Sequence, residues 1–315
     1  MQHPIRHLHH VTATVAEAIP DLAFCRGLLG LRLVKRTVNF DNHNVYHFYY
    51  GTEQGAPGTI WTTFPYAGWN VPPGVHGAGQ IVATTFSVPA DSLDAWRARA
   101  RTAGLSAEHG DDRFGAPWLA VRDPSGLVLE LIADERDQRV PWRGGGVDPA
   151  AAVRGLHGVT LLLRERAPTL AFMTGVLGFT MVDEGPGRTR LAVGNDQPGH
   201  LVDLVVSPDA PPARNGLGTV HHVAFAIGSA EEQLAVRAEL VRLGYDVTPV
   251  RDRTYFQSIY FREPGGVLFE VATMSPGFTY DEPLDRLGTA LKLPPWEEPN
   301  RAAIEAALPP LGGAD

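Results

Sequence analysis

The stretch VHHVAFAIGSAEEQLAVRAELVRLG, residues 220–244, decides the fold class because a strand pattern passes directly into a helix pattern. Its first eight residues alternate as those of a half-buried β-strand do. A capping box of Ser229 and Glu232 then begins a helix. We expect one face of this helix to carry Leu234, Ala238 and Val241. Three short apolar stretches predict further strands at residues 245–250, 255–261 and 266–272, which completes a βαβββ unit.

The same unit occurs four times along the chain. Each copy has a helix that ends at a glycine followed by an apolar residue, namely Gly30, Gly104, Gly178 and Gly244. Glycine suits this place because the residue after a helix often adopts a left-handed conformation. In the first copy we expect a helix over residues 17–29. The repeats predict an α+β fold with four βαβββ modules in two domains that form cupped mixed sheets.

A glycine- and proline-rich segment separates the second copy from the third. We therefore predict an N-terminal domain at residues 1–138, a linker at 139–153, a C-terminal domain at 154–275 and a C-terminal tail at 276–315. The sequence leaves open how the four units pair in space and what the tail does.

Composition limits the classes of function. The net charge is −8 over 315 residues, and the chain has no run of lysine or arginine that would suggest a nucleic-acid partner. No apolar stretch predicts a membrane span or a secretory signal. The single cysteine, Cys25, excludes an internal disulfide framework and a thiolate zinc cluster. We expect a cytoplasmic protein with small-molecule partners, no nucleic acid and no membrane; a homo-oligomer is left open.

Repeated βαβββ units of this kind resemble the vicinal oxygen chelate superfamily, which includes glyoxalases, bleomycin-resistance proteins and extradiol dioxygenases. The resemblance covers residues 5–275. It implies that units pair edge to edge into a half-open, cupped sheet. Because a fold alone does not assign a function, the chemistry has to come from the residues inside the cup.

Two copies begin with adjacent histidines, in LHHVTA at residues 8–13 and VHHVAF at 220–225. Because strand side chains alternate between faces, only one histidine of each pair is expected to face the cup. His10 and His222 are the predicted pair, since each shares its face with polar or small residues. Glu270 lies in the middle of an apolar strand, where a carboxylate is costly to bury without a charged partner. Two imidazoles and one carboxylate make the facial triad that binds non-haem ferrous iron.

The other two copies lack this set of side chains. His157 and Gly158 stand where the first copy has His9 and His10. The second copy has no histidine in its first strand but keeps Glu130 in the glutamate position. We expect these copies to form a structural or vestigial cup in which Glu130 is a hydrogen-bonded structural residue, although the sequence does not decide whether Glu130 has a metal role.

The position of a fourth protein ligand is held by a threonine. Aligning Gly58 with Gly266 places Thr62 opposite Glu270. A glyoxalase would supply a metal ligand there, and threonine binds divalent ions poorly. Three protein ligands leave room for a substrate oxygen and dioxygen, which an oxygenase needs. The alternatives are a glyoxalase-like or isomerase-like metalloenzyme and a non-catalytic protein that binds an aromatic compound or antibiotic.

Longer stretches are similar to one branch of the superfamily, the ring-cleaving dioxygenases that open hydroquinones and chlorohydroquinones. They include GLRLVKRTVNFD (30–41), GAPGTIWTTFP (55–65), DRTYFQSIYFREPGGVLFE (252–270) and GFTYDEPLDRLGTALKL (277–293). The resemblance implies ligation of Fe(II), or alternatively Mn(II), by His10, His222 and Glu270. It implies a small aromatic substrate, hydroquinone-like or catechol, with dioxygen as the second substrate; the ring substituents are not determined.

The same resemblance implies roles for residues around the metal. Catalytic roles fall to His9, His221, Arg253 and Tyr260, and substrate contacts to Thr12, Arg253 and Tyr260. Strict alternation turns His9 and His221 away from the cup, so a twist or bulge would have to re-aim them.

Overall fold

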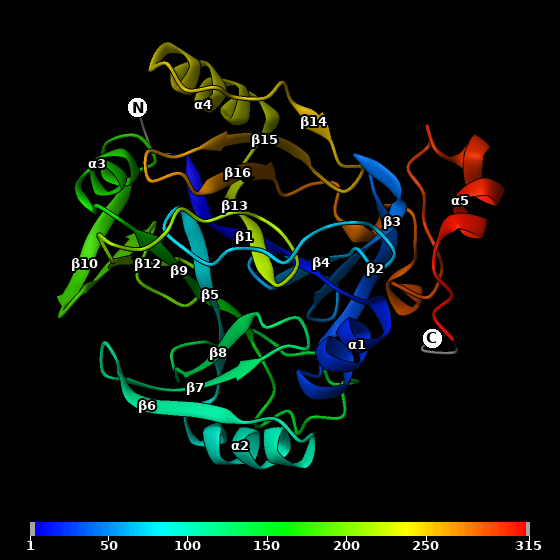
Figure 1. The fold of residues 1–315 in the computed structure, drawn as a ribbon, viewed down its shortest axis with the longest axis horizontal. Coiled ribbons are helices and arrows are strands. Elements are labelled where there is room, and N and C mark those ends of the chain that lie inside the picture. The colour runs from blue at the N-terminus through cyan, green and yellow to red at the C-terminus, as the bar shows by residue number, and fades with distance from the viewer. Residues whose placement is uncertain (1–3, 313–315) are drawn as a thin grey trace.

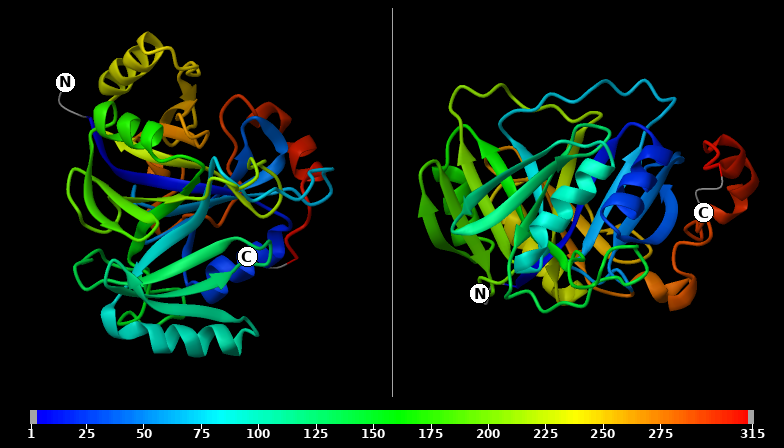
Figure 2. Two further views of the ribbon diagram at one scale, coloured as in Figure 1. Left: turned by 60° about the vertical axis from the view of Figure 1, so that its left-hand side comes forward. Right: turned by 90° about the horizontal axis from the view of Figure 1, so that it is seen from below.

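Two eight-stranded mixed sheets make up most of the protein (Figure 1). A computed structural model describes residues 4–312, without the side chains of residues 111 and 112. The strand order is β14-β15-β16-β13-β1-β4-β3-β2 in the first sheet and β10-β11-β12-β9-β5-β8-β7-β6 in the second. Both sheets curl, as the two further views show (Figure 2). The predicted α+β fold with cupped mixed sheets is confirmed.

The first sheet combines strands from the two ends of the chain. Its members are β1 (Ile5–Val15), β2 (Arg32–Asn39), β3 (Asn42–Gly51), β4 (Ile60–Pro65), β13 (Thr219–Ile227), β14 (Arg251–Asp252), β15 (Gln257–Arg262) and β16 (Leu268–Thr273). The second sheet comes from the middle of the chain. Its members are β5 (Gln80–Val88), β6 (Ala107–Arg113), β7 (Ala116–Arg122), β8 (Val128–Ala133), β9 (Gly155–Leu163), β10 (Phe179–Gly185), β11 (Arg188–Val193) and β12 (Leu201–Val206).

Each unit contributes one helical segment. These are α1 (Ala18–Leu22), which continues as the π-helix η1 (Ala23–Leu28), α2 (Leu93–Thr102), α3 (Ala167–Gly175) and α4 (Ala230–Arg242). The glycines predicted to end these segments all have a positive φ, between 67° and 90°. Shorter segments are η2 (Ala90–Ser92), η3 (Phe278–Tyr280), η4 (Leu284–Arg286), η5 (Glu298–Asn300) and α5 (Arg301–Ala307). Within residues 4–312, no helix has the length and apolar character needed to cross a membrane.

The centre of the first sheet joins the first and fourth units. Strands β1 and β13 are antiparallel neighbours, β4 runs parallel to β1, and β16 runs parallel to β13. The second sheet joins the second and third units in the same way through β5 and β9. A site built from His10, His222 and Glu270 requires the first unit to meet the fourth, and the sheet brings them together. Each sheet takes one unit from each half of the chain, and the domain division at residues 139–153 stays a prediction.

Strand β3 shows how alternation separates core from cup. Tyr46, Phe48 and Tyr50 belong to the main hydrophobic core, whereas His47 and Tyr49 line a cavity in the cup. Large aromatic rings on the core face fix the register of this strand, because a shift by one residue would expose them. His47, which lies between Tyr46 and Phe48, is thereby held inside the cup.

The fourth unit differs from its prediction in two places. Residues 245–250 form no strand, and the regular pairing begins only at β14. Helix α4 buries Gln233 and Leu240, whereas Leu234 and Val241 are exposed. The reason is a pair of hydrogen bonds in which the Gln233 amide donates to the carbonyl oxygens of residues 257 and 271, both at 2.8 Å. These bonds turn a polar residue toward the sheet.

The C-terminal tail lies along β2, at the outer edge of the first sheet (Figures 1 and 2). The backbone N–H of Lys292 donates to the Arg36 carbonyl at 2.9 Å. The fully buried Lys35 ammonium pairs with Asp281 at 2.5 Å and with Glu282. The Tyr255 hydroxyl also donates to Asp281, at 3.0 Å. The tail is thereby attached to Tyr255, whose neighbour Phe256 lines the cavity of the cup.

Candidate metal centre

Two β-bulges set the adjacent histidines of β1 and β13. Leu8 pairs with Phe225 and His10 with Ala224, so His9 is an extra residue on β1. On β13 the extra residue is His221, between the partners of Thr12 and Ala13. A bulge interrupts the alternation of side chains and re-aims its residues.

The alternation rule is therefore wrong for His221, whose ring lines the same cavity as those of His10 and His222. His9 does not line that cavity, but its ring packs against Phe256, which does, with centroids 4.9 Å apart. A bulge is thus present at both residues, and the cavity lining includes His221 but not His9.

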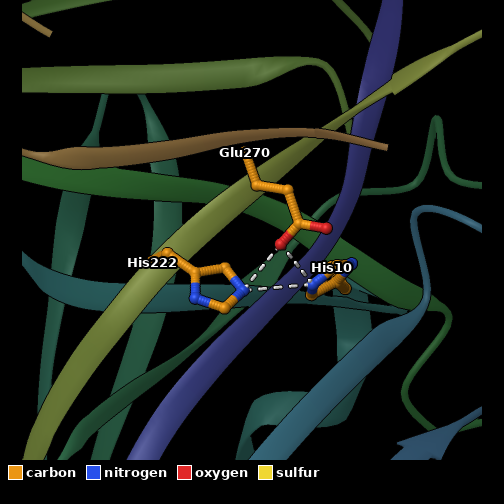
Figure 3. A group of neighbouring side chains, drawn as sticks. All are labelled: His10, His222 and Glu270. Carbon is orange, nitrogen blue, oxygen red and sulfur yellow. Dashed lines mark hydrogen bonds and ion pairs between the residues drawn. The ribbon is translucent and has the colours of Figure 1, made fainter. Parts of the chain in front are cut away.

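The side chains of His10, His222 and Glu270 converge on one point (Figure 3). His222 Nε2 lies 2.9 Å from Glu270 Oε2, His10 Nε2 lies 3.3 Å from the same oxygen, and the two nitrogens are 3.2 Å apart. All three side chains are buried. Burial alone raises the pKa of Glu270, so a positive charge at this point is needed to hold it below its ordinary value, either from hydrogens on His10 and His222 or from a cation in their place.

His9 indicates which nitrogen of His10 carries a hydrogen. Burial lowers the pKa of His9 well below its ordinary value, so His9 is neutral. Its Nε2 lies 3.2 Å from the Thr273 carbonyl oxygen, which can only accept, so Nε2 carries the hydrogen. His9 Nδ1 then accepts from His10 Nδ1 at 2.8 Å. With the hydrogen of His10 on Nδ1, its Nε2 can direct a lone pair at Glu270.

This arrangement fits a bound cation. A lone pair 3.3 Å from a carboxylate oxygen is repulsive unless a positive charge lies between them. Glu270 Oε2 is buried without a hydrogen-bond donor, while Oε1 accepts from the Ser258 hydroxyl. Metal-ligating histidines commonly have their second nitrogen bonded in this way. The donor set of two imidazole nitrogens and one carboxylate oxygen suits a divalent transition metal.

Thr62 occupies the position from which a fourth ligand would come. Thr62 pairs with Thr12 across β4 and β1, as Glu270 pairs with Ala224 across β16 and β13. Its hydroxyl donates to Thr12 Oγ1 at 2.8 Å. The predicted correspondence between Thr62 and Glu270 is thus present in the register, and the side of the site toward β4 offers no carboxylate.

A cavity of about 200 Å³ opens over the three converging side chains. Pockets for drug-sized ligands measure roughly 300–1,000 Å³, so this space suits a single ring. Its walls are partly aromatic and partly polar. Besides His10 and His222, the cavity is lined by the aromatic residues Phe40, Tyr49, Phe64, Tyr66 and Phe256 and by Thr12, Asn39, Asp41, His47, His221, Arg253 and Tyr260.

Arg253 and Tyr260 form a polar pair beside the converging side chains. Arg253 Nε donates to the Tyr260 hydroxyl at 3.1 Å, and Arg253 Nη2 contacts Asp41 at 3.0 Å. The Tyr260 ring meets the His222 ring edge to face at 5.7 Å. Burial raises the pKa of Tyr260, so its hydroxyl keeps its hydrogen. The pair offers a positive charge and a hydroxyl donor to a bound anion.

The structure gathers all of the predicted site residues around this point, but several lining residues are absent from the sequence prediction. These are Asn39 at the end of β2, Phe40 and Asp41 of the β2–β3 turn, His47, Tyr49, Phe64 and Tyr66. Strand parity could have found His47, since the rings of Tyr46, Phe48 and Tyr50 mark the opposite face. The turn residues carry no such signal, because only the closing of the sheet brings them over the cup.

Comparison with known proteins gives the family. Residues 155–271 match the Glyoxalase/Bleomycin resistance protein/Dioxygenase superfamily. The ring-cleaving dioxygenase MhqO of Bacillus subtilis (strain 168) is 40% identical to this chain over 96% of both sequences. The chlorohydroquinone/hydroquinone 1,2-dioxygenase of Sphingobium indicum is 36% identical over 91% of both. The chain belongs to this superfamily. Its place within the superfamily is among the ring-cleaving dioxygenases.

Solved structures agree with this assignment to the superfamily. A crystal structure of a dioxygenase from Bacillus subtilis superposes with a TM-score of 0.92 at 40% identity, over 97% of both chains. Glyoxalase I from Zea mays superposes with a TM-score of 0.63 at 15% identity, covering 85% of this chain and 92% of its own. The maize enzyme shows the shared fold alone.

Proposed function

We propose that this protein is an iron(II)-dependent, extradiol-type dioxygenase that opens the ring of a hydroquinone-like substrate. The observation that carries the proposal is the convergence of His10, His222 and Glu270 under a single-ring cavity, with no fourth ligand on β4. Such a site leaves coordination positions for a substrate oxygen and for dioxygen. The relative named chlorohydroquinone/hydroquinone 1,2-dioxygenase supports the choice of a para-diol.

His10, His222 and Glu270 would hold the metal. When bound, iron(II) supplies a Lewis acid that lowers the pKa of a substrate hydroxyl and a redox centre that activates dioxygen. Overall, one ring carbon–carbon bond is broken and both atoms of dioxygen enter the product. Mn(II) suits the same donor set and is the alternative metal.

His221 would donate a hydrogen bond to a substrate oxygen. Burial lowers its pKa to about 3, so the ring is neutral. For His222 Nε2 to bind a metal, His222 Nδ1 must carry the hydrogen and donate it to His221 Nδ1 at 2.7 Å, so His221 Nε2 keeps a hydrogen for the substrate. The parallel contact of His9 with His10 keeps the ligand ring oriented, and its outer nitrogen is bonded to backbone rather than open to the cavity.

Tyr260, Arg253 and Thr12 would position the substrate and stabilise negative charge. Tyr260 accepts from Arg253 through its oxygen, so its own hydrogen is free to donate into the cavity. Thr12 Oγ1 likewise accepts from Thr62 and keeps a hydrogen for a substrate oxygen. Preorganised donors of this kind stabilise charge that develops during a reaction. The aromatic walls exclude water around them.

Oxygen uptake by protein prepared without air and loaded with Fe(II) tests the proposal. We expect consumption of one dioxygen per hydroquinone or chlorohydroquinone ring, with slower or no uptake on catechol. His10→Ala should abolish both bound iron and oxygen uptake. The matched control is His109→Ala, which removes an exposed histidine from β6 of the second sheet. Full activity of His10→Ala with one iron per chain would overturn the ligand assignment.

Two other outcomes separate the alternative functions. Turnover that needs no dioxygen, with nickel, zinc or manganese as the active metal, would identify a glyoxalase-like isomerase. Tight binding of aromatic compounds with no turnover on any metal would identify a binding protein. Either result contradicts the dioxygenase proposal.

A further inference from the structure

His47 lies in the cup without a role in the proposed reaction. It stands on β3, in tilted contact with the rings of Tyr49 and Phe64 at centroid distances of 4.0 and 4.3 Å. Only 9% of its surface is exposed, and that part faces the cavity. A polar ring in such an aromatic setting is costly unless its nitrogens are used.

A hydrogen-bond chain fixes which nitrogen of His47 carries the hydrogen. The Thr62 hydroxyl donates to Thr12, so its oxygen is the acceptor for His47 Nε2 at 2.9 Å. Burial lowers the pKa of His47 well below its ordinary value, so the ring is neutral. Nδ1 is therefore unprotonated, and among residues 4–312 no group donates to it. His47 presents a free lone pair to the cavity.

The position of His47 differs from that of the Arg253–Tyr260 pair. Tyr260 lies on β15 and touches His222, so that pair stands next to the converging side chains. His47 touches none of the three and lies on β3, two strands from β1 on the other side of the sheet centre. Arg253 is already bonded to Tyr260 and Asp41, whereas His47 Nδ1 has no partner in the described chain.

A para-diol needs a hydrogen-bond partner for its second hydroxyl away from the metal, and an ortho-diol does not. Both hydroxyls of a catechol reach one metal ion, but the second hydroxyl of a hydroquinone lies across the ring. In a cavity with aromatic walls this hydroxyl needs an acceptor, because leaving its hydrogen unpaired carries the full desolvation penalty. The acceptor has to lie away from the metal ligands, as His47 does.

We propose that His47 Nδ1 accepts a hydrogen bond from the distal hydroxyl of a bound para-diol and so determines the preference of the site for hydroquinones. This inference rests on the proposed function, because it takes the proximal hydroxyl to lie at the metal centre. Thr62 is a positioning residue in this scheme, since it holds the ring through Nε2 and never meets the substrate.

Equilibrium binding of hydroquinone and of phenol tests the inference without turnover. Isothermal titration calorimetry on Fe(II)-loaded protein under argon should show hydroquinone binding roughly 10- to 100-fold more tightly than phenol. His47→Phe should lower hydroquinone affinity to the level of phenol and leave phenol affinity within about threefold. His109→Phe, in the second sheet, is the matched control and should change neither. A His47→Phe protein that still discriminates between the two ligands overturns the inference.

Two further measurements guard against a variant that fails to fold. Thr62→Val keeps the imidazole but removes its anchor, and should reduce the preference for hydroquinone about threefold to tenfold. In wild-type protein, ¹⁵N spectra should show His47 with a hydrogen on Nε2 and none on Nδ1; the opposite tautomer contradicts the inference. If the protein takes up oxygen on hydroquinone but His47→Phe still prefers hydroquinone to phenol, only the role of His47 is contradicted. If no diol supports oxygen uptake but His47→Phe loses the preference for hydroquinone over phenol, only the dioxygenase proposal is contradicted.

Discussion

The two sheets have the same geometry but neutralise their buried carboxylates differently. Bulges fall at corresponding places in the two central strand pairs, at His9 and His221 in the first sheet and at Val82 and His157 in the second. The residue after each bulge is His10 or His222 in the first sheet, but Ala83 or Gly158 in the second. The framework for a metal site is therefore present twice, and the imidazoles are present once.

The carboxylates of the second sheet have cationic partners from the chain itself. Glu130 pairs with Thr85 in the register that Glu270 has with Ala224, and it contacts Arg113 at 2.6 Å. Asp203 holds the equivalent position on β12 and contacts Arg188 at 3.0 Å and Arg190 at 2.8 Å. The sequence prediction overlooked Asp203.

The difference shows what distinguishes the candidate metal site from its counterpart in the second sheet. Within residues 4–312, Glu270 has no lysine or arginine partner, only two histidine nitrogens. A buried carboxylate requires a positive charge or a proton. The second sheet obtains the charge from arginine, and the first leaves a place for a cation from solution. The expectation that Glu130 is a hydrogen-bonded structural residue agrees with its bonds to Arg113.

Loss of the Glu270 carboxylate should have the largest effect on function. In Glu270→Gln we expect bound iron to disappear and oxygen uptake on hydroquinone to fall by at least about 10³-fold, because one of three ligands becomes neutral. Metal analysis and an oxygen electrode measure the two losses. Stoichiometric iron in this variant would contradict the conclusion that the Glu270 carboxylate is neutralised by a bound cation.

Lys35 extends the comparison to the tail, where an ammonium neutralises Asp281 and Glu282. Lys35→Met leaves both carboxylates without their cation, and we expect the free energy of unfolding to fall by about 3–5 kcal/mol. Urea denaturation measures the change. Lys292→Met, which removes the only other lysine of the chain, is the matched control. Equal stability of the two variants would show that the buried pair does not stabilise the fold.

Glu130→Gln should show the opposite pattern to Glu270→Gln. Arg113 loses its charged partner, so we expect a decrease of about 2 kcal/mol in the free energy of unfolding, with iron content unchanged. The control is Glu108→Gln, an exposed carboxylate on β6. A loss of iron in Glu130→Gln, with the fold intact, would mean that the second sheet also takes part in metal binding.

The buried carboxyl group of Asp21 is neutralised in a third way, by a proton instead of a cation. It accepts hydrogen bonds from Tyr50 at 2.7 Å and Thr63 at 2.6 Å, and burial raises its pKa to about 7 from an ordinary 3.8. The folded state holds the proton more tightly than the unfolded state does. Its contribution to stability is therefore present at low pH and is lost as pH rises from 3.8 to about 7.

Asp21→Asn should remove this dependence on pH. We expect the unfolding free energy of wild type, relative to Asp21→Asn, to fall by about 1–2 kcal/mol between roughly pH 6 and pH 8. Urea denaturation of both proteins across this range gives the difference, in which the other titrating groups cancel. A constant difference would mean that Asp21 stays charged in the folded protein.

Much of the site follows from local sequence, because strand alternation and repeat spacing are local properties. Comparing the four copies points to His10, His222 and Glu270 and places Thr62 opposite Glu270. The same reasoning misplaces His221, because a bulge depends on the register between β1 and β13 rather than on either strand alone. It also misses the buried face of α4, where the hydrogen bonds of Gln233 outweigh the apolar pattern.

The sequence by itself determined the βαβββ repeat, the glycines that end its helices and the residue types that distinguish the first and fourth units from the others. Only the tertiary structure decided the register in which these two units share a sheet, the bulges at His9 and His221, and the completion of the cavity by His47 and the β2–β3 turn. The reason is physical. Alternation and helix capping act over a few neighbouring residues, whereas register, sheet closure and the pairing of buried charges join residues far apart in the chain.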